Sequence, residues 1–271
     1  REARAKTNDR ETQMLRKDLL TSLLKTISGQ VILAKRSEAK SLDVFALSDI
    51  LQGVAVLTNE KTLDKLQPLA KLVVEMMERY DIEELYRLRP IKLVQCLQAI
   101  AKLQLGDRPL RFTIYSRLLK PDAVSKLPAA FLSHGLSALA AIESKDKDSF
   151  LLARSFMRRL RKQKVRDEGN MQDLCKALVA CDTLLKTGCM EGYEDEASIF
   201  GFTTLRAILK KKEETKHTFT PNEMASILSA WATLSTGDRE DTVITELLSI
   251  CHEQNTLQSC NVIQVEKIVS S

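Results

Sequence analysis

A seven-residue pattern, Leu-x-small-x-Ala-x-Leu, recurs five times in this chain and constrains its fold more than any other feature. The copies span residues 51–57, 97–103, 136–142, 178–184 and 228–234, and their last residues lie 39 to 50 positions apart. Self-similarity at about this period is typical of helical repeats, in which each unit buries its apolar face against its neighbours. The sequence therefore predicts an all-α fold, an α-solenoid of about five two-helix repeats stacked as a right-handed superhelix.

The five copies agree at several positions of a helical wheel. If the last residue of each copy is position 0, then position −6 is Leu in every copy, position −4 is Gly or Ala, and positions −3 and −10 are mostly large and apolar. These columns cover roughly 200° of the wheel, more than the ~100° stripe of a helix lying on one core. A bulky centre with small edges suits a helix packed between its partner and the equivalent helices of adjacent repeats. A Leu/Ala-rich bundle without repeats is the alternative.

A second apolar helix is expected after each copy. The expected ranges are approximately 62–79, 109–119, 149–163, 196–211 and 241–253. Thr220-Pro221-Asn222-Glu223 is a capping box that marks the start of the last copy's helix. An extra N-terminal helix is predicted at about Asp9 to Ile27, so we divide the chain into a lead-in at 1–40 and one continuous array at 41–271. A sixth repeat is expected to begin near Gln258.

Composition excludes several classes of protein. With 271 residues, 44% of them hydrophobic, the chain can bury a continuous core. It contains no run of eighteen uncharged apolar residues, so no membrane span is expected. The six cysteines and three histidines lack the close spacing of a metal site, and we expect reduced thiols and no metal or other cofactor. No phosphate-binding loop or catalytic motif is present, so the sequence predicts that the protein is not an enzyme.

Positive charge is concentrated in one short segment. Residues 154–166 contain seven basic side chains without an intervening acid: Arg154, Arg158, Arg159, Arg161, Lys162, Lys164 and Arg166. Their spacing predicts basic ridges on a helix that continues through the segment. A second cluster, Lys210, Lys211 and Lys212, ends the second helix of the next repeat, while Arg117 and Lys120 lie near the end of the preceding one. In a stack of repeats these ends would line up along one edge.

An edge of this kind attracts the phosphate backbone of RNA, and the release of counterions makes that attraction depend on salt. The ten basic residues of the two clusters are therefore the candidate RNA-binding residues. Two structural causes could also produce such clusters, since cations are favoured at helix C-termini by the macrodipole and charge runs often form a solvated surface. The acidic run from Glu191 to Glu196 is expected to avoid phosphate and to contact a protein.

Three repeat segments resemble a known family. Ala99-Ile100-Ala101-Lys102-Leu103, the segment 136–140, and above all Ser226-Ile227-Leu228-Ser229-Ala230-Trp231-Ala232-Thr233-Leu234 are similar to the "LLWALAKL" core of octotricopeptide and heptatricopeptide repeats. Such repeats occur in organellar RNA-binding proteins, including the FAST-kinase-like and RAP-domain proteins. The resemblance implies a helical-repeat fold, RNA and ribonucleoprotein proteins as partners, and a mitochondrial matrix or plastid location; without it a cytoplasmic protein is expected.

The chain also departs from the family pattern. It lacks the Pro-rich lead-in with Glu-Trp, its repeats are unevenly spaced, and no RAP-like segment follows the array within these residues. Backbone contact therefore fits better than readout of one base per repeat. The expected function is non-catalytic RNA binding in an organellar ribonucleoprotein, such as a component of the mitochondrial ribosome or an RNA maturation or translation factor. The alternative is a protein–protein scaffold without direct RNA contact.

Overall fold

The described residues of the computed structural model are helical and contain no strand, so the chain is all-α. The structure describes residues 26–29, 31–32, 42–234, 245–247 and 249–250. The predicted N-terminal helix lies almost entirely outside the described residues, and the predicted sixth repeat lies wholly outside them. No helix among the described residues is long and apolar enough to cross a membrane.

Each copy of the pattern lies on a helix, which we call a first helix. The first helices are α2 (Val44–Leu57), α5 (Pro90–Lys102), α8 (Ala129–Ile142), α11 (Met171–Lys186) and α13 (Pro221–Leu234). Side-chain caps explain where three of them begin. Asp43 and Asn170 accept hydrogen bonds from backbone amides of α2 and α11, and Thr220 and Glu223 form the predicted reciprocal bonds before α13.

Four of the predicted second helices are described in full. They are α3 (Leu63–Met77), α6 (Leu110–Leu118), α9 (Lys147–Leu160) and α12 (Glu194–Thr215). The expected helix at 241–253 is described only at residues 245–247 and 249–250, where Leu247 and Ile250 are buried. Three short helices that were not predicted from the sequence follow α3, α6 and α9: α4 (Ile82–Tyr86), α7 (Pro121–Ser125) and α10 (Gln163–Glu168).

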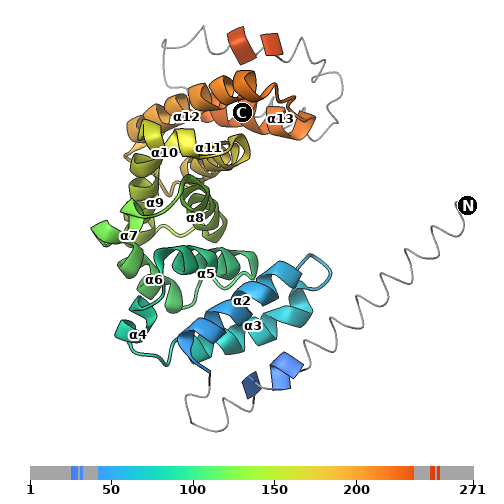
Figure 1. Ribbon diagram of the computed structural model, residues 1–271, viewed down its shortest axis with the longest axis vertical. Coiled ribbons are helices and arrows are strands. Elements are labelled where there is room, and N and C mark those ends of the chain that lie inside the picture. Colours follow the sequence, from blue (N-terminus) through green and yellow to red (C-terminus); the bar gives the residue numbers. More distant parts are fainter. Residues whose placement is uncertain (1–25, 30, 33–41, 235–244, 248, 251–271) are drawn as a thin grey trace, which may run out of the picture.

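Packing follows the order of the chain. Each first helix contacts the next, from α2 through α5, α8 and α11 to α13, and the pairs α2–α3, α5–α6, α8–α9 and α11–α12 also pack together. Figure 1 shows these helices following one another along the long axis of the molecule. One continuous cluster of buried residues runs through them. The bulky positions −3 and −10 are buried in all five first helices, as the helical wheel predicts.

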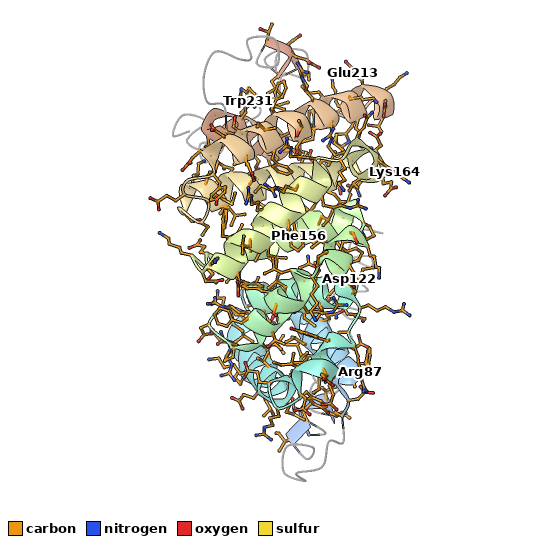
Figure 2. The ribbon with its side chains drawn as sticks, turned by 90° about the vertical axis from the view of Figure 1, so that its left-hand side faces the viewer. Arg87, Asp122, Phe156, Lys164, Glu213 and Trp231 are labelled. Atoms are coloured by element: carbon orange, nitrogen blue, oxygen red, sulfur yellow. The ribbon has the colours of Figure 1, made fainter. Side chains whose placement is uncertain are left out.

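One close approach between helices depends on a glycine. A Cβ atom added to Gly135 of α8 would lie 2.4 Å from Cε2 of Phe156, whose ring is fully buried on α9 (Figure 2). No real side chain tolerates that distance, so the absence of a side chain at 135 lets the aromatic ring pack against the backbone of α8.

The three short helices lie along one edge of the molecule, together with the C-terminal part of α12. Figure 1 places α4, α7 and α10 on the same side of the stack, and Figure 2 shows Arg87, Asp122, Lys164 and Glu213 following one another along the right-hand side. We call this the short-helix edge. It gathers the ends of successive second helices, which is where the sequence analysis expected the basic clusters.

Candidate nucleic-acid interface

The basic run at 154–166 is divided between two helices. The predicted continuous helix is wrong here, because α9 ends at Leu160 and a separate helix, α10, begins at Gln163. Residues Arg161 and Lys162 form the turn between them. The expected basic ridges therefore do not continue past residue 160, and the two halves of the run have different surroundings.

The first half of the run is paired with an acid from α12. Arg154 donates from Nε and Nη2 to the two carboxylate oxygens of Glu196, at 2.7 and 2.6 Å. Arg158 donates to the same carboxylate at 2.8 Å. These hydrogen bonds hold the pKa of Glu196 at about 2, well below its ordinary value. Arg154 also lies over the ring of Tyr193, 4.8 Å from its centre.

This arrangement changes the interpretation of the acidic run at 191–196. Glu196 stands in the first turn of α12, where the positive end of the helix dipole also favours a carboxylate. Its carboxylate links α9 to α12 within the chain, and the expectation that the acidic run contacts a protein stays a prediction. The absence of an acid within 154–166 does not mean that these arginines lack one in the fold.

The cations in the second half of the run form no ion pair among the described residues, although Asp167 and Glu168 follow them on α10. Within the described residues, the side chains of Arg161, Lys162 and Lys164 have no ion-pair partner, and Lys162 and Lys164 are exposed. Arg166 donates to the backbone carbonyl of Arg161. Burial, and secondarily the nearby charge of Arg161, lower the pKa of Arg166, although the Asp167 carboxylate acts in the opposite direction.

The second basic cluster meets this half of the run. Lys211 Nζ of α12 donates to the backbone carbonyl of Asp167 in α10 at 3.0 Å, across 44 residues of sequence. Lys212 has no carboxylate partner in the described part of the chain, whereas Lys210 lies 3.7 Å from Glu214. The fold thus brings the segment that carries Arg161, Lys162, Lys164 and Arg166 next to the part of α12 that carries Lys211 and Lys212, and we call these six residues the α10 corner.

Three of the ten candidate residues lie on α9, outside this corner. Arg154 and Arg158 are bound to Glu196, as described above, although the side chain of Arg158 remains 56% exposed. The Arg159 side chain is partly buried, and its Nε atom is fully enclosed without a hydrogen-bond partner in the described residues.

A smaller group of cations lies farther along the short-helix edge. Lys120 Nζ lies 4.2 Å from the centre of the Tyr86 ring, and the guanidinium of Arg117 lies 5.9 Å from it. Arg117 is also paired with Asp122 at 3.3 Å. The positions of Arg117 and Lys120 near a helix end were predicted from the sequence. Tyr86 was not, because it lies on α4, a short helix without an apolar period.

A separate groove of about 560 Å³ lies over α8, α11 and α13. Its lining consists of side chains of these three first helices and lacks aromatic and arginine residues. None of the six corner residues contributes to it. The described residues contain no group of His, Cys, Asp and Glu side chains that could hold a metal ion.

Comparison with known proteins adds no relative to this description. No protein-family model matches the chain, and no curated protein matches it significantly.

Proposed function

We propose that the chain is a non-catalytic helical-repeat protein that binds the phosphate backbone of RNA at the α10 corner. The proposal includes the arrangement of the helix pairs as an α-solenoid of about five repeats. Its support is the order of packing, since first helices contact first helices in sequence order. Five related helices stacked in this way are typical of solenoid repeats.

The observation that carries RNA binding is the hydrogen bond from Lys211 to the Asp167 carbonyl. It joins two basic clusters from consecutive repeats without using a carboxylate. Guanidinium and ammonium groups concentrated in this way bind phosphates and release counterions. Because they contact phosphate oxygens rather than base edges, they position a strand without selecting its sequence.

The resemblance of 226–234 to octotricopeptide and heptatricopeptide cores supports an organellar role. On that basis we propose a mitochondrial ribonucleoprotein, such as the mitochondrial ribosome or an RNA maturation or translation complex, with its RNA and proteins as partners. The alternative remains a scaffold that contacts only proteins.

The test is a salt titration of binding to a fluorescently labelled, uridine-rich 20-nucleotide RNA. We expect binding of the unmodified protein to weaken steeply between 50 and 300 mM salt, by about 0.9 in log K per unit of log salt for each contacted duplex phosphate and about 0.7 for each single-strand phosphate. The double variant Lys162→Glu/Lys164→Glu should bind about 10- to 100-fold less tightly at ~100 mM salt.

The matched control is Lys61→Glu/Lys65→Glu, which makes the same change of net charge at exposed residues near the start of α3. Its affinity should stay within about twofold of the unmodified protein if binding is local to the corner. Equal losses in both variants would show a non-specific charge effect. Salt-independent binding, or no binding at all, would favour the scaffold.

A further inference from the structure

Tyr86 is a partly buried aromatic residue at the C-terminal end of α4, on the short-helix edge. Its hydroxyl lies 2.9 Å from Oγ of Ser116 on α6, across 30 residues of sequence. Tyr86 also borders a small apolar cavity together with Leu88, Leu110 and Ile114, which are buried. Because α6 holds its hydroxyl and the core adjoins it, the Tyr86 ring is a fixed aromatic surface at this edge.

The group that covers the solvent side of this ring is a lysine. Lys120 Nζ lies 4.2 Å from the ring centre, and Lys120 is exposed and forms no ion pair in the described part of the chain. Arg117 lies farther from the ring, at 5.9 Å, and is paired with Asp122. An exposed ammonium on a flexible stem is held only weakly by a ring. A planar ligand group can therefore take the place of Lys120 over Tyr86.

The charges around the ring favour a nucleotide over a bare phosphate. Glu83 is exposed and precedes Tyr86 by one turn of α4, so its carboxylate repels phosphate from that side. Arg87 directly follows Tyr86, is exposed, and has no ion-pair partner among the described residues. A nucleotide that places its base over the ring and its phosphates beside Arg87 and Lys120 fits this distribution of charge.

The Tyr86 ring and the α10 corner lie on the same edge of the molecule. Successive contacts connect α4 to α6, α6 to α9 and α9 to α10, and Figure 2 shows Arg87 and Lys164 on the same side. Two interhelix spacings of 8–10 Å separate the α6 layer from the α12 layer, which is roughly 20 Å. At 3.4 Å per phosphate of one strand, that distance corresponds to about six nucleotides.

We propose that Tyr86 stacks an unpaired base of the RNA strand whose phosphates bind the α10 corner, so that the protein selects single-stranded over duplex RNA. This role of Tyr86 rests on the RNA binding proposed for the corner. Stacking on an aromatic ring accepts any base, because every base has a π-face. Paired bases are already stacked within a duplex and cannot reach the ring. When the base binds, the Lys120 ammonium moves from the ring to a neighbouring phosphate.

The experiment measures anisotropy of the labelled uridine-rich 20-nucleotide RNA at ~100 mM salt, both alone and annealed to its complement. Tyr86→Leu should weaken binding of the single strand about 5-fold or more and leave binding of the duplex within about twofold. Tyr86→Phe keeps the ring and should bind both forms like the unmodified protein. Lys120→Gln should reduce the salt slope for the single strand by about 0.7.

The matched control is Phe202→Leu. Phe202 is also a partly buried aromatic residue with a cation over its ring, since the guanidinium of Arg206 lies 4.2 Å from its centre. It lies on α12, nine residues before Lys211, and its substitution should leave both affinities unchanged. A stacked base also quenches indole fluorescence. Emission from Tyr86→Trp should therefore fall with the single strand and not with the duplex, while Trp231, the other tryptophan, is buried.

Three results would overturn the role of Tyr86. They are equal losses for single strand and duplex in Tyr86→Leu, equal losses in Tyr86→Leu and Phe202→Leu, and unquenched emission of Tyr86→Trp with bound single strand. If Lys162→Glu/Lys164→Glu still weakens binding in these cases, the α10 corner remains an RNA site without a stacked base. Failure of the unmodified protein to bind either form of RNA would overturn RNA binding itself.

Discussion

The two halves of the 154–166 run share a composition but differ in what surrounds them. On α9, Arg154 and Arg158 donate to one carboxylate from α12. Around α10, Arg166 and Lys211 donate only to backbone carbonyls, and their neighbours Lys162 and Lys164 lack an ion-pair partner among the described residues. The difference teaches that the local density of positive charge does not locate a phosphate site. What matters is whether the fold supplies an acid from a distant part of the chain.

The largest expected effect is a difference in RNA affinity between variants of the two halves of the 154–166 run. Neutralising the corner with Arg161→Gln/Lys164→Gln should weaken RNA binding about 10-fold or more at ~100 mM salt, because each phosphate contact carries part of the salt-dependent affinity. The equivalent change on α9, Arg154→Gln/Arg158→Gln, should weaken it by less than about threefold. Fluorescence anisotropy with the same RNA measures both. Equal losses of RNA affinity in the two variants would mean that pairing with Glu196 does not prevent the α9 arginines from binding phosphate.

The second prediction removes the acid instead of the cations. Glu196→Gln should lower the melting temperature by about 2–4 °C, since a partly buried link between α9 and α12 is lost. The same variant should bind RNA a few-fold more tightly, because Arg154 and Arg158 become available to phosphate. Calorimetry and anisotropy test the two effects separately. Weaker RNA binding would contradict the assignment of Glu196 as a competitor of phosphate.

The third prediction follows from the low pKa of Glu196. Its folded pKa of about 2 lies below the ordinary value of 4.5, so its ionised form stabilises the folded state. That contribution is fully present above pH 4.5 and is lost as the pH falls toward 2. The difference in melting temperature between the unmodified protein and Glu196→Gln should therefore be constant from pH 7 to 5 and shrink below that. A difference that persists at pH 2 would exclude this origin.

The smallest effect concerns the link between the two clusters. Lys211→Met keeps the apolar stem but removes both the charge and the bond to the Asp167 carbonyl, whereas Lys212→Met removes a charge alone. We expect losses of RNA affinity of about threefold and twofold. Faster hydrogen exchange of the amides at 163–168 should occur only in Lys211→Met. The same exchange rates in both variants would show that Lys211 does not hold α10.

Helical periodicity was enough to predict the first helices, because buried positions such as Leu97 and Leu136 carry apolar residues at helical spacing. The capping box at Thr220 fixed the start of α13 for the same reason, since its bonds are local. Periodicity could not predict α10, because a helix of six residues completes fewer than two turns.

The candidate site was less predictable than the helices. The sequence named all six residues of the α10 corner and expected the two clusters to share an edge. It could not show that Glu196 pairs with arginines 38 and 42 positions away, because such contacts leave no local signal. The hydrogen bond from Lys211 to Asp167 spans a similar separation in the sequence and could not be predicted from it either.

Because of the contact between Gly135 and Phe156, the residues that one position can accept depend on the residue at the other. A residue larger than glycine at 135 requires the buried ring at 156 to shift or to be replaced by a smaller side chain, so the two positions should covary among related sequences. Anyone transplanting this helix pair into a designed protein would need to carry both residues together.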